Sequence, residues 1–134
     1  MFVDACALVA VFAKEPAASA YEKAIDDAPD PWTTAFAIFE TVLVLARPGL
    51  LGTDYQATLQ VVLRYLSDRE VALRELGAPE EVLRNAVSVA ERHGVSKRAL
   101  SAFDCFHYAA AKTAGSSMLT LDKLLRDTDV PTLP

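Results

Sequence analysis

The sequence predicts a three-layer α/β/α sandwich in which a short, mostly parallel central sheet is covered by helices on both faces. Short apolar segments with strand propensity alternate with helical segments along the chain, an order typical of parallel strands joined by right-handed helical crossovers. The chain has 134 residues, of which 52% are hydrophobic and 23% charged. This composition excludes a disordered chain and is sufficient for one ordinary core. We therefore expect a single domain over residues 1–134.

Five short segments are expected to form the sheet. The first is apolar and stops at Asp4, and the fourth runs directly into Asp122. The second has high strand propensity, whereas the third is a weak candidate. The expected strands are Met1–Val3, Trp32–Thr34, Glu70–Leu73, Ser117–Leu121 and Val130–Leu133.

Four helices are expected in the first half of the chain. An unbroken apolar run follows Asp4, and Pro16 suits the start of a second helix. A third, strongly apolar helix is stopped by Pro48 and Gly49, and Thr53 is a candidate N-cap for the fourth. The four ranges are Ala5–Ala13, Ala17–Asp27, Ala35–Ala46 and Thr53–Leu66.

Three helices are expected in the second half. The first is amphipathic and has acids in its first turn and bases in its last, the arrangement that the helix dipole favours. The second ends at Gly115, and the third is a single turn after Asp122. The ranges are Pro79–His93, Ser101–Ala114 and Lys123–Asp127.

Charge and composition exclude several classes of function. The net charge of −5 argues against passive, sequence-independent coating of nucleic acid, which normally requires a basic surface. Acidic residues that hold metal ions can nevertheless support nucleic-acid cleavage. No apolar run is long enough to cross a membrane, and the N-terminus lacks the features of a signal peptide. We expect a cytoplasmic protein whose two cysteines are reduced thiols.

Four acidic residues occupy unusual positions. Asp4 and Asp122 each follow an expected strand, although either could be a plain N-cap. Asp104 lies between two phenylalanines, where Ser101 is the better N-cap candidate. Glu40 lies in the middle of an apolar helix and has no basic neighbour three or four residues away, so it is either a lone solvated acid or part of a site.

These four acids are expected to form one cluster, because each has an apolar setting and lies at a strand end or on the inner face of a helix. Clustered carboxylates repel one another, and a divalent cation removes the conflict. An oxygen-only ligand set suits Mg²⁺ or Mn²⁺. Asp127 and Asp129 could add a ligand or a nearby charge, or they could be ordinary turn residues.

A zinc site is a weaker interpretation of other residues. Cys6, Cys105 and His107 match no standard zinc spacing, and small cysteines on buried helices are ordinary core residues. His107 lies three residues after Asp104 and could share its helix face. It could contact a substrate, or it could be a half-buried histidine whose hydrogen bonds are satisfied locally.

The ordered set of acidic motifs resembles the PIN-domain family, especially its VapC-type toxins. The first ten residues are similar to the family's opening strand, Asp and apolar helix. The segment Phe39–Val42 resembles its helix-borne Glu motif, Phe103–Lys112 its third acidic motif, and Met118–Asp122 the strand that delivers its fourth acid. The resemblance covers essentially the whole chain.

The resemblance implies a Mg²⁺-dependent endoribonuclease that acts as the toxin of a toxin–antitoxin pair and hydrolyses RNA phosphodiester bonds. It also implies a homodimer and neutralisation by a cognate antitoxin. By motif position, Asp4, Glu40, Asp104 and Asp122 would be metal ligands. Thr120 would help to orient water or phosphate at the site.

One departure from the family pattern keeps a second function open. The position two residues after the first Asp is usually Ser or Thr, and here it is Cys6, a weaker hydrogen-bond donor. The alternative is therefore a catalytically weakened PIN-like module that works through protein contacts. A phosphoacceptor receiver domain is a poor third candidate, because Asp4 stands alone and the third expected strand is followed by a base, Arg74, rather than an acceptor Asp.

The sequence also suggests where a protein partner would bind. The helix at 35–46 and one face of the next are unusually apolar for a small monomer. If the two helices form a hairpin, their outer edges could accept an apolar segment of the antitoxin, with an arginine reaching Asp4 and Asp104. Alternatively, both faces could be buried in the core or in a homodimer. The second face comprises Tyr55, Leu59, Val62, Leu63 and Leu66.

Overall fold

Five parallel strands form the centre of the computed structural model, which describes residues 1–133. Pro134, the last residue of the expected domain, lies outside the described residues. The order across the sheet is β3-β2-β1-β4-β5, with every neighbouring pair parallel. The strands are β1 (Phe2–Val3), β2 (Trp32–Thr34), β3 (Ala72–Arg74), β4 (Met118–Leu119) and β5 (Thr132–Leu133).

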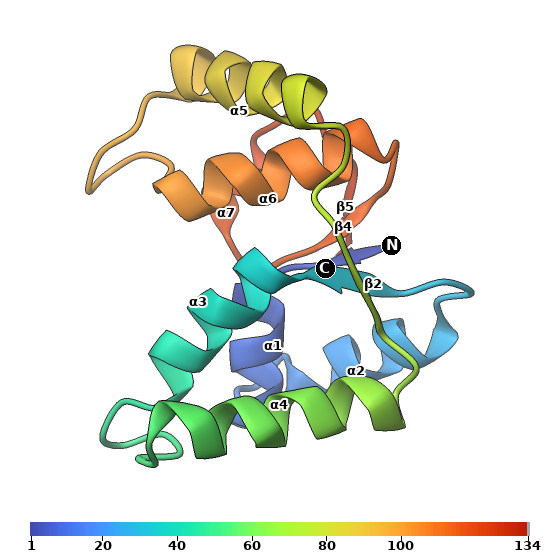
Figure 1. Ribbon diagram of the computed structural model, residues 1–134, viewed down its shortest axis with the longest axis vertical. Helices are drawn as coiled ribbons and strands as arrows, with labels where there is room; N and C mark the ends of the chain where they lie inside the picture. The colour runs from blue at the N-terminus through green and yellow to red at the C-terminus, as the bar shows by residue number, and fades with distance from the viewer. Residues whose placement is uncertain (134) are drawn as a thin grey trace.

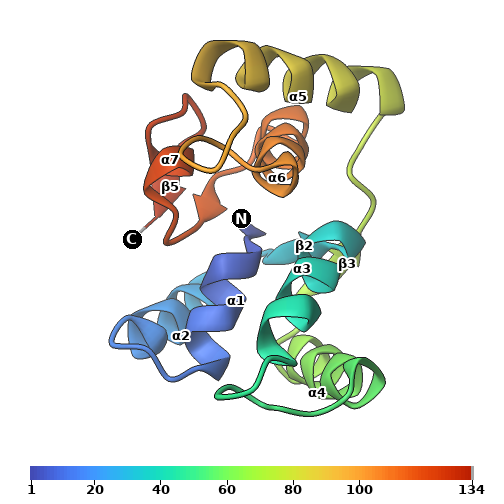
Figure 2. The same ribbon diagram turned by 90° about the vertical axis from the view of Figure 1, so that its left-hand side faces the viewer.

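Helices cover both faces of this sheet, which confirms the expected α/β/α layers (Figures 1 and 2). The lower layer in Figure 1 contains α1 (Ala5–Phe12), α2 (Ala18–Asp27), α3 (Ala35–Leu45) and α4 (Tyr55–Asp68). The upper layer contains α5 (Pro79–His93), α6 (Ala102–Thr113) and α7 (Lys123–Arg126). Among residues 1–133, no helix combines the length and apolar character that a membrane span requires.

Two expected boundaries are corrected by local hydrogen bonding. The N-cap of α4 is Asp54 rather than Thr53, because the Asp54 carboxylate accepts a hydrogen bond from Ala57 N at 2.8 Å. The third strand starts at Ala72 rather than Glu70, because Glu70 adopts a φ of +54°. Its backbone N–H bonds Ser67 O, and Val71 N bonds Leu66 O. This Schellman motif ends α4 and delays the strand.

Strand alternation divides the core into two clusters. Phe2 and Met118 face α5 and α6, whereas the next residues, Val3 and Leu119, face the layer of α1 to α4. All four side chains are fully buried. Because successive side chains of a strand point to opposite faces, strands of two residues are sufficient to anchor both helical layers.

The sheet order creates a topological switch at β1. The chain adds β2 and β3 on one side of β1 and then returns to add β4 and β5 on the other. In open α/β sheets, the functional crevice lies beyond the carboxyl ends of the strands at such a point. Here β1 leads into Asp4, and β4 leads into Thr120.

A polar cluster joins α5, α6 and the loop before β5. Asp129 accepts hydrogen bonds from the Tyr108 hydroxyl at 2.7 Å and from Lys112 Nζ at 2.9 Å. The guanidinium of Arg92 also donates to the Tyr108 hydroxyl. The hydrogen bond from Lys112, followed by that from Tyr108, lowers the pKa of Asp129 from its ordinary 3.8 to about 2. Asp129 therefore has a structural role in this cluster, and it contacts none of the four expected site acids.

We expect Asp129→Asn to destabilise the fold at neutral pH but not in strong acid. A lowered folded-state pKa stabilises the protein above pH 3.8, and this contribution is lost as the pH falls toward 2. Because the Asp129 side chain is 47% exposed, solvent screening limits the effect to about 1 kcal/mol or less. Denaturant unfolding at pH 7 and near pH 2 measures the difference. Asp127→Asn, an exposed turn residue with the same charge change, is the control. If Asp129→Asn is still less stable than the wild type near pH 2, the ionised carboxylate of Asp129 is not the source of the stabilisation.

Candidate active site

Asp4 is a buried carboxylate at the switch point of the sheet. It caps α1, because Oδ1 accepts a hydrogen bond from Ala5 N at 2.8 Å. Its other oxygen, Oδ2, accepts from the Thr120 hydroxyl at 2.7 Å and from Cys6 Sγ at 2.8 Å. The residue is 2% exposed. The interpretation of Asp4 as an N-cap is thus confirmed. An N-cap does not need to be buried, however, and a buried carboxylate needs a partner that compensates its charge.

Cys6 takes part in this hydrogen-bond network as a neutral thiol. Burial, followed by the nearby charge of Asp4, raises the pKa of the Cys6 thiol well above its ordinary value. The thiol therefore retains its proton at neutral pH and donates it to Asp4. Its sulfur also accepts a hydrogen bond from Leu121 N at 3.2 Å. Cys6 thus ties the start of α1 to the end of β4, the connection that a serine or threonine hydroxyl would make more strongly.

Glu40 is neither a lone solvated acid nor paired within its own helix. Its Oε2 lies 2.6 Å from Nε2 of His107, which α6 brings across from the other side of the sheet's carboxyl edge. The same nitrogen lies 3.7 Å from Asp4 Oδ1. His107 thus stands between two of the four expected site acids. Its burial is complete, which corrects the expectation of a half-buried histidine.

The surrounding acids favour a proton on His107. Burial alone lowers the pKa of an imidazole, but the hydrogen bond to Glu40 and the charges of Asp4, Glu40 and Asp104 act in the opposite direction. The acids prevail, and the pKa of His107 lies above its ordinary 6.5. A negative potential strong enough to outweigh burial is also what attracts a cation.

Asp104 and Asp122 flank this centre with their side chains engaged in helix caps. Asp104 Oδ2 accepts a hydrogen bond from Ser101 N at 2.6 Å, and Ser101 caps α6 as expected. Asp122 Oδ1 accepts from Leu124 N at 2.7 Å, which caps α7. The backbone N–H of Asp122 donates to the Thr120 hydroxyl, so Thr120 connects Asp4 to the Asp122 turn. Both acids are partly exposed.

The side chains are not arranged as a closed metal centre. Within residues 1–133, no three His, Cys, Asp or Glu side chains are grouped closely enough to hold an ion. The donor chemistry nevertheless fits Mg²⁺ or Mn²⁺, since all four acids offer oxygen atoms. Among the described residues, none of the four forms an ion pair with lysine or arginine. This negative charge is compensated in part by a single imidazole.

The zinc interpretation does not fit the structure. Cys6 contacts Asp4 and Thr120, whereas Cys105 is buried in the core cluster between α5 and α6. The spacing of three residues from Asp104 marks His107 as a candidate site residue in the sequence. Its contact with Glu40 has no such local signal, because it joins residues 67 positions apart.

The comparisons with known proteins agree with this geometry. The family model described as "PIN domain" matches residues 1–131. A curated ribonuclease VapC3 of Pyrobaculum aerophilum is 31% identical over 130 residues, covering 95% of this chain and 92% of the relative. A ribonuclease VapC of Mycolicibacterium smegmatis is 31% identical over 137 aligned residues, covering 97% of each chain. With a buried acid at the sheet's switch point and a family match over nearly its whole length, the chain belongs to the PIN domain family.

Proposed function

We propose that this chain is a divalent-metal-dependent endoribonuclease that acts in the cytoplasm as the toxin of a toxin–antitoxin pair. The observation that carries the proposal is the buried Asp4 carboxylate, which faces Glu40 across one imidazole without a lysine or arginine partner. Both named relatives are ribonucleases of the VapC type, which supports RNA as the substrate and an antitoxin as the partner.

Four acids would hold the ion in this proposal. Asp4 and Asp104 are the principal ligands, and Glu40 and Asp122 complete the set directly or through water. When bound, Mg²⁺ or Mn²⁺ would activate water and stabilise the charge that develops on the scissile phosphate. Thr120 and Cys6 hold one oxygen of Asp4, which leaves Oδ1 as the oxygen directed toward Glu40 and His107.

Metal removal tests the proposed reaction. We expect EDTA to abolish cleavage of RNA by the purified chain, and we expect Mg²⁺ or Mn²⁺ to restore it, because the acids alone cannot neutralise a phosphodiester. Gel analysis of a defined RNA measures both steps. Asp104→Asn, purified in the same way, is the control for contaminating nuclease. Cleavage that resists EDTA, or that the control retains in full, contradicts the proposal.

Cys6→Ser distinguishes the nuclease from the alternative of a catalytically weakened interaction module. The serine hydroxyl is a stronger hydrogen-bond donor to Asp4 than the thiol in the same position. We therefore expect the Cys6→Ser variant to cleave RNA at least as fast as the wild type. If the wild type is inactive and serine restores cleavage, the thiol accounts for a weakened site. A loss of a hundredfold or more, about 2.7 kcal/mol at the barrier, would show that the thiol has a role of its own.

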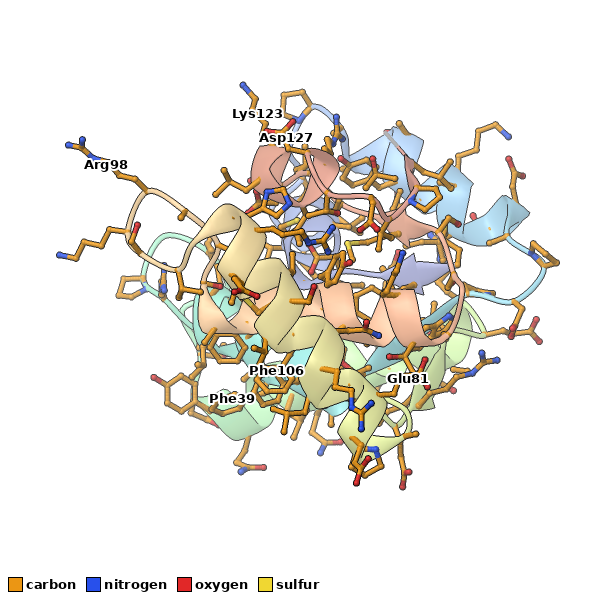
Figure 3. All side chains as sticks on the ribbon, turned by 90° about the horizontal axis from the view of Figure 1, so that it is seen from above. Phe39, Glu81, Arg98, Phe106, Lys123 and Asp127 are labelled. Atoms are coloured by element: carbon orange, nitrogen blue, oxygen red, sulfur yellow. The ribbon has the colours of Figure 1, made fainter. Side chains whose placement is uncertain are left out.

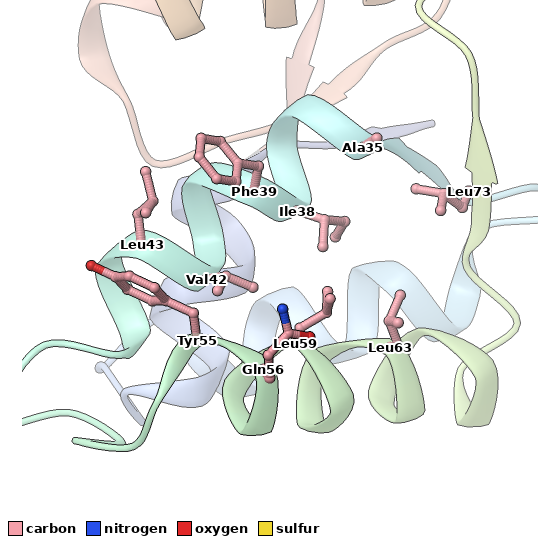
Figure 4. Close-up of a pocket in the computed structure, with 10 residues that line it drawn as sticks. All are labelled: Ala35, Ile38, Phe39, Val42, Leu43, Tyr55, Gln56, Leu59, Leu63 and Leu73. Carbon is pink, nitrogen blue, oxygen red and sulfur yellow. The ribbon is translucent and has the colours of Figure 1, made fainter.

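In this proposal the antitoxin binds an apolar groove that lies between α3 and α4 (Figure 4). The groove has a volume of about 520 Å³, and among the ten side chains that line it only Gln56 and Tyr55 carry polar atoms. Phe39 and Tyr55 at its rim are 55% and 59% exposed. Val62 and Leu66, in contrast, are buried in the protein's own core, so the expected apolar face of α4 divides between core and groove. An amphipathic partner segment fits such a surface.

A homodimer is also part of the proposal. Leu83 and Val87 on α5 are each 58% exposed, Val95 after the helix is 54% exposed, and all three line a shallow hollow shared with α6. This surface lies in the upper layer of Figure 1, whereas the groove lies in the lower layer. A second copy on α5 and an antitoxin on α3 and α4 would therefore bind to separate surfaces. Figure 3 views the molecule from the α5 side and shows Phe106 beside that helix.

A further inference from the structure

His107 occupies a position that no core requirement explains. Its ring is fully buried on α6, with Phe2 and Phe103 rings at centroid distances of 5.9 and 6.3 Å. In this apolar slot a leucine would pack without any polar atom to satisfy. The imidazole instead leaves Nδ1 buried with no hydrogen-bond partner among the described residues. An unsatisfied buried nitrogen weakens the fold, so the side chain must be explained by what its other nitrogen does.

The other ring nitrogen of His107, Nε2, contacts the acidic site. An ionised carboxylate can only accept hydrogen bonds, so Nε2 is the donor in the 2.6 Å contact with Glu40 Oε2. The 3.7 Å separation from Asp4 Oδ1 is too long for a hydrogen bond, but it shows that both carboxylates lie close to the same imidazole nitrogen. No other hydrogen bond of the imidazole is found within residues 1–133.

Glu40 depends on this contact for its orientation. Its side chain has three rotatable bonds and is 26% exposed, so water alone could satisfy it in many rotamers. Its own helix supplies no partner, because the neighbours three and four residues away are Phe36, Ala37, Leu43 and Val44. The hydrogen bond from α6 therefore selects the rotamer that directs the carboxylate toward Asp4. Carboxylate ligands of metals are commonly held by such outer hydrogen bonds.

We propose that His107 is a positioning residue that holds Glu40 beside Asp4 for divalent-cation binding. The inference rests on the proposed function, because it assigns a role within the same site. His107 binds neither the cation nor the RNA in this scheme. It acts through Glu40, and it links α6, which carries Asp104, to α3, which carries Glu40.

The test measures Mn²⁺ binding directly, by isothermal titration or electron paramagnetic resonance, on the full chain. We expect His107→Leu to weaken Mn²⁺ binding by about 10- to 100-fold, the usual effect of losing an outer partner of a metal ligand. His107→Gln, whose amide can reach Glu40, should recover most of the affinity. His107→Asn is polar but too short to reach Glu40, so it should behave like the leucine variant.

A double-mutant cycle identifies the route of the effect. If His107 acts through Glu40, then His107→Leu should weaken Mn²⁺ binding in the wild type but not in a Glu40→Gln background. Circular dichroism confirms that each variant is folded at the temperature of the titration. If His107→Leu does not fold, the comparison of glutamine with asparagine carries the test alone.

The outcomes separate this inference from the function on which it rests. Wild-type protein that binds Mn²⁺ and cleaves RNA, combined with unchanged or tighter binding in His107→Leu and His107→Asn, overturns the positioning role and leaves the nuclease intact. The positioning role is also overturned if His107→Leu weakens Mn²⁺ binding equally in the wild-type and Glu40→Gln backgrounds, since the effect would then not pass through Glu40. Wild-type protein that neither binds Mn²⁺ nor cleaves RNA overturns both.

Discussion

Asp4→Asn is expected to lower RNA cleavage by at least about a hundredfold, or about 2.7 kcal/mol at the barrier, while the chain remains folded. Asparagine is as good an N-cap as aspartate, so its amide oxygen can still accept the hydrogen bond from Ala5 N. What is lost is the negative charge that attracts a cation. In the wild type, the Cys6 thiol and the Thr120 hydroxyl donate hydrogen bonds to Asp4 Oδ2. In the variant, their hydrogens can rotate away from the new amide group.

Two melting measurements accompany the activity assay for Asp4→Asn. Without metal, the variant should melt at or above the wild-type temperature, because repulsion among the clustered acids falls. Added Mg²⁺ should raise the melting temperature of the wild type, which binds it, and leave that of the variant unchanged. Asp127→Asn is the matched control, since it removes an exposed acid from the end of α7. Full cleavage by Asp4→Asn, with control preparations clean, would refute the ligand assignment.

Leu59→Glu is expected to weaken antitoxin binding by at least about thirtyfold, which corresponds to about 2 kcal/mol. Leu59 lines the groove between α3 and α4, and a carboxylate there cannot be solvated beneath an apolar partner segment. Tyr55→Glu tests the same surface at a more exposed position. As the first residue of α4, it tolerates an acid, which the helix dipole favours.

Val61→Glu is the control for these groove variants. Val61 is on the same helix and 47% exposed, but it does not line the groove. The candidate antitoxin for this test is the protein encoded by the gene adjacent to that of this chain, and titration of the purified pair gives the dissociation constants. If all three variants bind equally well, the partner does not occupy the groove. RNA cleavage by the isolated Tyr55→Glu chain should equal that of the wild type, because Tyr55 lies outside the acidic site.

The sheet and most helices could be predicted because their signals are local. The apolar residues before Asp4 and Asp122, the prolines at 16 and 79, and Gly115 each act on their own segment. The expected start of the third strand at Glu70 is wrong, because Glu70 follows α4 in a left-handed conformation that is typical of glycine. Nothing in the composition of that segment indicates which residue takes the positive φ.

The candidate site was predictable in its acids but not in its contacts. Asp4 and Thr120 were brought to one sheet edge by the parallel topology, which follows from the order of the elements. The pairing of His107 with Glu40 depends on how α6 crosses α3, and this angle is set by packing between side chains distant in sequence. The sequence likewise indicated Ser101 as the cap of α6, but not that Asp104 would return the hydrogen bond.

The pairing of β1 with β4 also determines when the site can form during synthesis. The chain leaves the ribosome with its N-terminus first, so β1 emerges long before the strand that lies beside it. Asp4 cannot meet the Thr120 hydroxyl, and β1 has no neighbour on that side, until residues 118–120 have been made. Products of premature termination before this point carry Asp4 but not the site, because they lack the strand and the hydroxyl that complete it.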